Sequence, residues 1–443
     1  MNDTPINYEI VKRNIEESNL VSLSKATIRE IKKLIDEIEK DTGEKYIRME
    51  MGIPGLPPAK VGIDGEIAAL KKGVASKYPD IQGIPELKIE SSRFVKLFLN
   101  VDVDPEGCIP TVGSMQGSFA AFIILNRMYE KKDTVLFLDP GFPVHKQQLK
   151  VLGQKWETFD VYDYRADKLR AKLDEVLSKG NISSMLYSNP NNPSWICFTE
   201  DELKIIAEAA DKYNVIVLED LAYVGMDFRK DLYTPGRPPY QATVARYTDN
   251  YILFISSSKA FSYAGQRIGM MVISNKLFNR TCPDLNKYYS SDKFGYAMIF
   301  GTIYPLSAGV THSAQHALTA MYKAANNGKF NFVDIVKEYG EKAKVMKKLF
   351  TDNGFYIVYK TDVDEPIADG FYFTIAYPGL TGEELLNELI YYGVSAISLA
   401  ITGSERTAGI RACVSLVQRE QFPDLEYRLK KFYENHPVKK PQS

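Results

Sequence analysis

Apolar residues recur at helical spacing near the start of the chain. Between Ser24 and Lys40, the apolar positions are Ile28, Ile31, Leu34, Ile35 and Ile38. This spacing predicts an amphipathic helix, which a serine can cap at its start and Gly43 can end. Residues 51–58 are rich in proline and glycine, so no regular element is expected there.

From about residue 110 to 275, short apolar runs alternate with amphipathic stretches. The runs cover residues 135–138, 184–188, 215–219, 251–255 and 268–273, and helix-like segments cover 163–178 and 199–213. Strands that are apolar throughout and separated by helices indicate a parallel sheet covered on both faces. Because ligands bind at the carboxyl ends of such strands, the polar residues that end these runs are the candidate functional residues.

The pattern changes near residue 330. A lysine-rich helix at 332–350 precedes apolar stretches near 354–358, 370–375 and 410–416, and a further helix starts at Thr381. This mixture indicates a compact α+β domain. The predicted fold is therefore α/β, with a large domain at 71–330 built on a mostly parallel sheet. Residues 331–443 would form the smaller domain, and residues 1–70 would supply an N-terminal arm and a further part of it.

Composition and charge narrow the class of protein. Of 443 residues, 45% are hydrophobic and 25% are charged, and the formal net charge is −1. Such a balance is typical of globular proteins and gives no general attraction to nucleic acid or to acidic lipid. The acidic start lacks the regions of a signal peptide, so a cytoplasmic protein is expected. The weakly polar run 296–310 is too short for a membrane span and predicts a buried core segment.

No metal site is predicted. The cysteines at positions 108, 197, 282 and 413 lie too far apart for a CxxC metal motif, and ordinary buried thiols are expected. His312 and His316 are four residues apart, which places both on one face of a helix. The residue after His312 is Ser313, however, and not the glutamate of a zinc-protease helix.

Polar side chains follow three of the predicted strands. Residues 188–194 (SNPNNPS) follow the first, residues 220–223 (DLAY) the second, and residues 256–259 (SSSK) the third, with Arg267 eight residues after Lys259. Each motif alone has an ordinary explanation as a turn, a helix cap or a solvated lysine. Their order and spacing together are far more specific.

Taken together, these motifs resemble those of the class I/II aminotransferases, which are fold-type-I pyridoxal-phosphate enzymes. The resemblance extends from about Gly52 to Arg411. The matching segments are Gly113–Gly117 (GSMQG), Asn191–Ser194 (NNPS), Asp220–Tyr223, Ser256–Lys259 followed by Arg267-Ile268-Gly269, and Gly409-Ile410-Arg411. The resemblance implies transfer of an amino group between an L-amino acid and a 2-oxo acid, with aspartate or an aromatic amino acid as a possible donor.

The resemblance also implies how pyridoxal 5′-phosphate is held. Lys259 would form a Schiff base with the cofactor and then carry the proton during the reaction. Asp220 would pair with the pyridine nitrogen. Tyr223 and Asn192 would donate hydrogen bonds to the phenolic oxygen.

The cofactor phosphate requires oriented hydrogen-bond donors. The turn at Gly113 would present the backbone N–H groups of Ser114 and Met115 at the start of a helix. The residues of the family's motif that would add further contacts are Ser256, Ser258 and Arg267. Phe142, in Asp139–Pro143 (DPGFP), occupies the position where the family stacks an aromatic ring on the pyridine.

Two further positions concern the substrate, and one concerns assembly. Arg411 would bind the substrate carboxylate through two parallel hydrogen bonds, which lysine does poorly. Gly52 matches a glycine whose backbone closes over the substrate. Tyr78, in Lys77–Gly83 (KYPDIQG), resembles the tyrosine that reaches the cofactor phosphate of the neighbouring subunit, so a homodimer is expected.

The chain departs from the family pattern in two places. The turn NPS is followed by Trp195 where the family has glycine, which leaves the backbone conformation there open. Between Thr281 and Phe330 no arginine is present to bind a distal carboxylate across the dimer, although Lys293 is a possible substitute. A carbon–sulfur β-lyase on the same scaffold remains an alternative. A non-catalytic regulator is less favoured, because no DNA-binding segment is recognised before Gly52.

Overall fold

The structure, a computed structural model, describes residues 3–438 and divides into two compact units. Unit 1 comprises residues up to 55, residues 192–196 and residues from 337 onward, and unit 2 comprises 56–191 and 197–336. The N-terminal boundary lies at residue 55 and not near 70, because α3 (Lys60–Lys71) packs along α13 (His312–Asn326). The packing is close: a Cβ at Gly62 would lie 2.8 Å from the sulfur of Met321.

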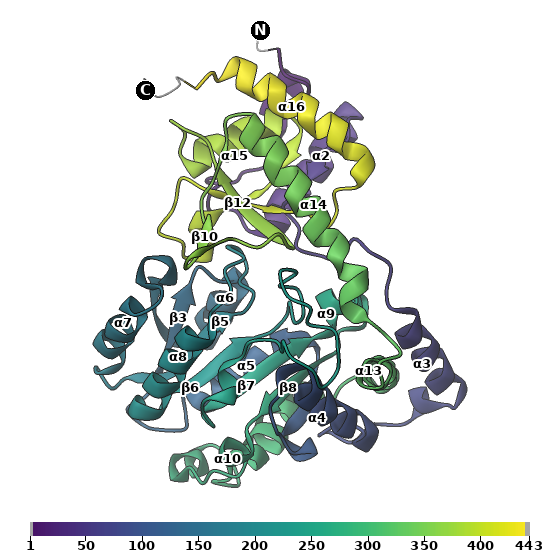
Figure 1. Ribbon diagram of the computed structural model, residues 1–443, viewed down its shortest axis with the longest axis vertical. Helices are drawn as coiled ribbons and strands as arrows, with labels where there is room; N and C mark the ends of the chain where they lie inside the picture. Colours follow the sequence, from purple (N-terminus) through teal and green to yellow (C-terminus); the bar gives the residue numbers. More distant parts are fainter. Residues whose placement is uncertain (1–2, 439–443) are drawn as a thin grey trace. The chain divides into compact units, whose positions relative to one another are not determined.

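Unit 2 contains a seven-stranded sheet with the order β2-β8-β7-β6-β5-β3-β4 (Figure 1). The strands are β2 (Cys108–Thr111), β3 (Thr134–Asp139), β4 (Lys155–Asp160), β5 (Ile182–Ser188), β6 (Ile216–Asp220), β7 (Tyr251–Ser256) and β8 (Gly269–Ile273). Strands β3 to β7 are parallel, and β8 runs antiparallel to both of its neighbours. The predicted mostly parallel sheet is confirmed.

Helices cover both faces of this sheet. They include α4 (Pro85–Leu99), α5 (Gly113–Leu125), α6 (Pro143–Leu152), α7 (Lys168–Leu177) and α8 (Glu200–Tyr213). The short helices α9 (Ser257–Ala260) and α10 (Asn275–Phe278) follow β7 and β8. On one face, Phe122 of α5 belongs to a core cluster with Leu218 of β6 and Phe254 of β7. Because side chains alternate along a strand, Asp220 belongs to the same face as Leu218, and Glu219 belongs to the other.

The segment from residue 294 to 307 differs from the predicted buried run. It forms α11 (Phe294–Tyr296), a π-helical stretch (Ala297–Ile303) and α12 (Tyr304–Ser307). Met298 and Ile303 are buried as expected, but Tyr296, Phe300 and Tyr304 are 47%, 41% and 51% exposed. The prediction was wrong for these three aromatic residues because their spacing of four places them together on the outer side of a helix.

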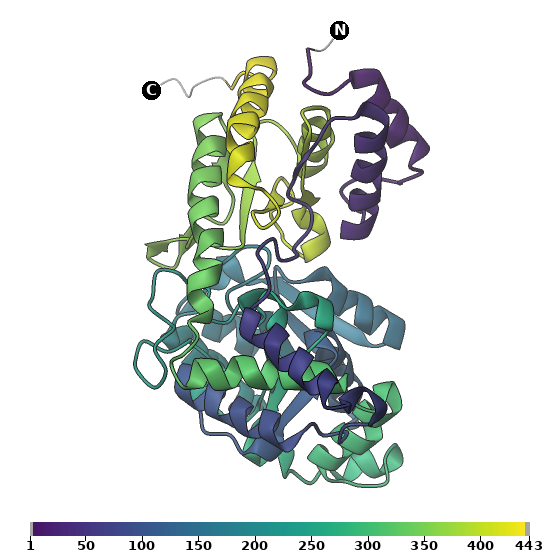
Figure 2. The ribbon, with the colours of Figure 1, turned by 90° about the vertical axis from the view of Figure 1, so that its right-hand side faces the viewer.

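Unit 1 is an α+β unit. Its elements are α1 (Tyr8–Glu17), α2 (Ile28–Thr42), β1 (Ile47–Arg48), α14 (Phe332–Asp352, which begins in unit 2), β9 (Tyr356–Ile357), β10 (Thr361–Asp362), β11 (Glu365–Pro366), β12 (Tyr372–Ala376), α15 (Gly382–Tyr391), β13 (Val394–Ser395), β14 (Ile397–Ser398), β15 (Ile410–Cys413) and α16 (Phe422–Asn435). Four strands form a sheet with the order β14-β15-β12-β9. Helices α14 and α16 lie on one side of the unit, and α1 and α2 lie on the opposite side (Figure 2).

Local sequence explains the first long helix in detail. Helix α2 begins after Thr27, whose side chain accepts a hydrogen bond from the Glu30 backbone while Glu30 caps the Thr27 N–H in return. This capping box replaces the serine cap expected from the sequence. The helix ends at Gly43, which has φ +75°, as predicted. Within residues 3–438, no helix is both long and apolar enough to cross a membrane.

Candidate active site

Three neighbouring strands of unit 2 end in polar residues at one edge of the sheet. Strand β5 ends at Ser188, β6 at Asp220 and β7 at Ser256. Ser188 is paired with Asp220, and Asp220 with Phe254. The segments selected from the sequence are therefore brought together at the carboxyl edge of the parallel strands, where the topology places a binding site.

Asp220 is a buried carboxyl group at this edge, with 6% of its surface exposed. Burial raises the pKa of Asp220 to about 7, while the backbone N–H of Ala222 and the positive charge of Lys259 act in the opposite direction. The Ala222 N–H donates to Asp220 Oδ1 at 3.1 Å. A carboxylate that is shielded from water in this way favours a cationic partner, because a second positive charge beside it would offset the free-energy cost of its desolvation.

Lys259 lies in the short helix α9, directly after β7, and is half-buried. The preceding serines hold this turn: Ser256 Oγ accepts from the Ser258 N–H at 3.1 Å, and Ser257 Oγ donates to the Ile268 carbonyl at 2.6 Å. The backbone that carries the lysine is therefore fixed from both sides. Ser256 is engaged as a helix cap, a role that sequence analysis did not assign to it.

The start of α5 forms a compact cradle with Arg267. Gly113 has φ +63°, and a Cβ added there would lie 2.6 Å from the Arg267 guanidinium, so this position requires glycine. The Gly113 N–H donates to the Arg267 carbonyl at 3.0 Å. No side chain caps α5, so among the described residues the N–H groups of Ser114 and Met115 in its first turn have no capping side chain.

This cradle fits a phosphate group. Ser114 Oγ is buried and has no hydrogen-bond partner among residues 3–438. A buried hydroxyl without a partner is unfavourable unless a ligand satisfies it. The helix amino terminus, the Arg267 guanidinium and this hydroxyl together supply the charge and the donors that a phosphate dianion requires.

Other nominated residues of unit 2 occupy different environments. Tyr223 is buried in the turn after β6. Phe142 is half-buried at the start of α6, and its ring packs edge-on against His145 with centroids 5.4 Å apart. Tyr78 is 93% exposed, and the neighbouring Lys77 carbonyl contacts His312 Nδ1 at 3.1 Å.

In unit 1, Arg411 is the centre of a second cluster. It lies on β15 and is 1% exposed. Its Nη2 donates to the Glu50 carbonyl at 2.6 Å and its Nη1 to Asn192 Oδ1 at 3.3 Å, while its buried Nε has no partner. In the part of the chain that the structure describes, no carboxylate forms an ion pair with it. A buried guanidinium without an acidic partner is unfavourable unless an anionic ligand supplies the missing charge.

Trp195 keeps the backbone conformation that a glycine would adopt. Its φ is +65°, in the left-handed region, and its side chain is fully buried. A non-glycine residue in this conformation is unfavourable unless packing holds it. Gly370 provides the space, because a Cβ there would lie 1.9 Å from the indole Cε2. The question left open by the sequence is thus answered: the turn is preserved, and the indole fills a gap beside Gly370.

Sequence reasoning missed Tyr372, which lies within an apolar run and resembles an ordinary core residue. The Arg411 Cζ lies 4.6 Å from the centroid of the Tyr372 ring. Gly52 lies against the same side chain, because a Cβ on Gly52 would be 2.1 Å from the Tyr372 hydroxyl. Gly52, which was predicted to contact the substrate, therefore lies close to Tyr372, and the Tyr372 ring packs on Arg411.

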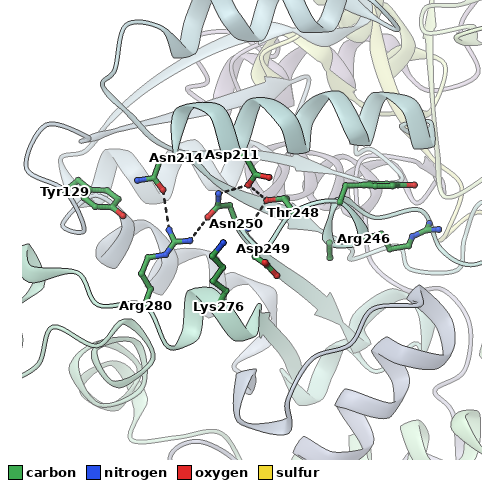
Figure 3. A pocket seen from close by; sticks show the side chains of 11 residues that line it. Tyr129, Asp211, Asn214, Arg246, Thr248, Asp249, Asn250, Lys276 and Arg280 are labelled. Atoms are coloured by element: carbon green, nitrogen blue, oxygen red, sulfur yellow. Dashed lines mark hydrogen bonds between the residues drawn. The ribbon is translucent and has the colours of Figure 1, made fainter.

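A separate cavity of about 770 Å³ lies at the opposite, amino-terminal edge of the sheet in unit 2 (Figure 3). Arg280 donates to Asn250 Oδ1 at 2.6 Å and to Asn214 Oδ1 at 3.4 Å, and Asp211 accepts from Asn250 and Thr248. These polar groups satisfy one another. None of the nominated site residues lines this cavity.

Comparison with known proteins gives consistent matches. The family described as aminotransferase class I and II matches residues 45–425. The chain is 24% identical over 322 residues to a probable aspartate aminotransferase of Methanocaldococcus jannaschii, which covers 68% of this chain and 82% of that protein. It is 27% identical over 355 residues to the LL-diaminopimelate aminotransferase of Aquifex aeolicus, covering 79% and 82% of the two chains.

A solved structure of aspartate aminotransferase from Thermus thermophilus with maleate has a TM-score of 0.71 to this chain. The two are 16% identical, and the match covers 95% of this chain and 98% of that one. A likeness at this level of identity shows that the two chains share a fold. The α/β architecture expected from the sequence is confirmed by it.

Proposed function

The chain belongs to the aminotransferase class I and II family and is a pyridoxal-phosphate-dependent transaminase, and we propose that Lys259 attaches the cofactor and that Arg411 binds the carboxylate of the amino-acid substrate. The observation that carries the proposal is the arrangement in unit 2. A half-buried lysine, a buried aspartate and an uncapped helix start lie along the carboxyl edge of one sheet.

We assign the following roles to the residues of unit 2. The cofactor, when bound, supplies an electron sink for the pair of electrons left when the substrate Cα loses its proton. Lys259 holds the cofactor and then moves the proton at Cα. Asp220 keeps the ring nitrogen protonated, since its own burial makes a cationic partner favourable. Tyr223 donates to the phenolic oxygen, and Phe142 packs on the ring.

The phosphate is held at the start of α5. Backbone N–H groups of Ser114 and Met115, the Ser114 hydroxyl and the Arg267 guanidinium bind its oxygens. Ser256 and Ser258 act mainly by shaping the turn that carries Lys259, because Ser256 Oγ is already engaged with the Ser258 N–H.

In unit 1, Arg411 binds the α-carboxylate of the substrate. Its orientation is fixed by the Glu50 carbonyl and by Asn192, and its Nε and remaining N–H hydrogens are left for a ligand. A planar carboxylate matches this fork of donors. The donor amino acid itself is left open, since the relatives named above act on substrates with different side chains.

Reduction with borohydride tests the attachment of the cofactor. The purified protein is expected to be yellow, and borohydride is expected to fix the cofactor on Lys259, where peptide mapping locates it. The Lys259→Ala variant should carry no label. Lys88 offers a matched control: burial lowers its pKa, but it is hydrogen-bonded to the carbonyls of Gln82 and Glu106.

The Lys88→Arg variant should therefore keep the label. A label on any lysine other than Lys259 would disprove the assignment. The same preparation can be mixed with a panel of L-amino acids. Conversion of the cofactor absorbance to the pyridoxamine form indicates transamination, whereas release of pyruvate and ammonia without a 2-oxo acid acceptor indicates the β-lyase alternative.

We further propose that two copies of the chain form a homodimer. Tyr296, Phe300 and Tyr304 make an exposed aromatic stripe at a spacing of four residues on the helical segment 294–307. The segment containing Tyr78 lies beside the residues that follow this stripe, because a Cβ on Gly309 would lie 3.7 Å from the Ile81 Cα. Exposed aromatic side chains grouped in this way are typical of an interface between subunits. A second copy of the chain would cover both the stripe and Tyr78.

Subunit exchange tests whether the sites are shared. Tyr78→Ala and Lys259→Ala should each be poorly active or inactive alone. In a mixed dimer with shared sites, one site carries both changes and the other carries neither. Complete exchange of equal amounts should then restore about a quarter of the wild-type activity, because half of the dimers are mixed and each has one intact site.

The Tyr288→Ala variant serves as a control, since Tyr288 is also an exposed aromatic residue of unit 2 but lies outside the stripe. When Tyr288→Ala is mixed with Lys259→Ala, the activity of the mixture should not exceed the activity that the Tyr288→Ala subunits have alone. A failure to recover activity in the Tyr78→Ala mixture, despite demonstrated exchange, would rule out shared sites. A monomer with full activity would also rule out shared sites.

A further inference from the structure

Tyr372 and Arg411 lie on the same face of the sheet in unit 1. Strands β12 and β15 are antiparallel, with Tyr372 opposite Cys413 and Thr374 opposite Arg411. Residues two apart on a strand share a face, so Tyr372 and Arg411 are diagonal neighbours. A long side chain spans that distance, and the Arg411 guanidinium accordingly lies over the Tyr372 ring, 4.6 Å from its centroid.

Two neighbouring residues, Trp195 and Gly52, confine the Tyr372 side chain. The Trp195 indole packs edge-on against it, with centroids 6.1 Å apart and planes at 65°. The backbone at Gly52 also lies close, because a Cβ there would be 2.1 Å from the Tyr372 hydroxyl. Gly370 precedes Tyr372 by two residues, and the indole occupies the space that a side chain at 370 would fill. Tyr372 and Trp195 are 2% and 0% exposed.

We infer that Tyr372 and Trp195 are positioning residues that orient Arg411 for carboxylate binding. Trp195 keeps the phenol ring in one orientation, and the ring keeps the guanidinium in one plane through a cation–π contact. The Glu50 carbonyl and Asn192 occupy one hydrogen of Nη2 and one of Nη1. The hydrogens left for a ligand then point in a fixed direction, which matters because a two-point carboxylate contact tolerates little rotation.

This inference rests on the proposed role of Arg411, and it assigns a purpose to the departure at residue 195. With a glycine at that position, the space beside Gly370 would be empty and Tyr372 would be free to tilt. The tryptophan fills that space at the expense of a left-handed backbone conformation. A fully buried aromatic residue in this conformation is held by its packing, and what it packs against is the ring beneath Arg411.

The test separates binding from chemistry in the holoenzyme. The rate of the first half-reaction is measured against the concentration of L-alanine, a small L-amino acid that offers little beyond its carboxylate and amine. We expect Tyr372→Leu to raise the apparent Kd for L-alanine about tenfold, with the maximal rate little changed. Tyr372→Phe keeps the ring and should restore a Kd within about twofold of wild type.

Trp195→Gly should raise the apparent Kd several-fold, and the double variant Trp195→Gly/Tyr372→Leu should be no worse than Tyr372→Leu alone. Such non-additivity is expected only if Trp195 acts through the ring. Tyr359→Leu is the matched control, because Tyr359 is a buried tyrosine of the same unit with Arg406 over its ring at 5.4 Å. Its apparent Kd for L-alanine should be unchanged.

The outcomes distinguish this inference from the proposed function. If Arg411→Lys leaves the apparent Kd unchanged, the carboxylate role of Arg411 is wrong, and the positioning role falls with it. If Arg411→Lys raises it but a folded Tyr372→Leu does not, only the positioning role is wrong. If Tyr372→Leu fails to fold, the Trp195→Gly variant alone tests the positioning role. A folded Trp195→Gly variant with an unchanged apparent Kd for L-alanine would then overturn the inference.

Discussion

Asp220→Asn is expected to lower the maximal rate of transamination by at least about 100-fold, the scale on which a preorganised electrostatic partner acts in catalysis. Asparagine has nearly the same shape as aspartate, but its neutral amide cannot keep the ring nitrogen protonated as a carboxylate does. Substrate contacts made by Arg411 should persist, so the apparent Kd for the amino acid should change far less. Stopped-flow absorbance of the first half-reaction measures both quantities.

Glu219 provides a matched control one residue earlier on the same strand. Burial also raises the pKa of Glu219 to about 7, and its carboxyl group accepts hydrogen bonds from Tyr187, Thr243 and the Val244 N–H. Because it belongs to the opposite face of the sheet, Glu219→Gln should lower stability through this network while the maximal rate stays within a few-fold of wild type. Equal losses of rate in the two variants would show that burial of a carboxyl group, and not its position at the cofactor, accounts for the effect.

Arg411→Lys is expected to raise the apparent Kd for amino-acid donors by about 10- to 100-fold, because a charged two-point contact contributes roughly 1.5–3 kcal/mol. The maximal rate at saturation should fall much less. Lysine keeps the positive charge but cannot reach the Glu50 carbonyl, Asn192 and a carboxylate at once. Titration of the holoenzyme with the preferred donor measures the change.

Arg428 is the matched control for this substitution. It is a buried arginine of the same unit, 5% exposed, but it has an acidic partner in Asp424 and also donates to the carbonyls of Gly393 and Lys45. Arg428→Lys should therefore lower the melting temperature without changing the apparent Kd for the donor. An unchanged Kd in a folded Arg411→Lys variant would contradict the carboxylate role.

The strands that carry the site could be predicted from sequence because they are buried on both faces. Strands β5, β6 and β7 appear as uninterrupted apolar runs, and a polar residue ends each of them. Strand β4 was missed, because Lys155 to Glu157 at the edge of the sheet are partly or fully exposed and lack that pattern. A single sequence reveals strands mainly through runs of buried apolar residues. An edge strand such as β4 is only half-buried and therefore lacks such a run.

The contacts around Arg411 could not be predicted for a different reason. They join residues 195, 370, 372 and 411, whose proximity depends on tertiary packing. The sequence showed a glycine at 370 and a tryptophan at 195, but nothing in it indicates that one fills the space left by the other. The aromatic stripe at 296, 300 and 304 was likewise hidden, because hydrophobicity alone does not reveal which side of a helix faces outward.

The pairing of Trp195 with Gly370 also restricts how these two positions can change over evolutionary time. A Cβ at residue 370 would lie 1.9 Å from the indole, so alanine at 370 and tryptophan at 195 are mutually exclusive in this backbone. In a lineage that began with a larger residue at 370, glycine there had to come before tryptophan at 195. The reverse path requires the tryptophan to be lost first. The two sites are therefore epistatic, and each determines which substitutions natural selection can accept at the other.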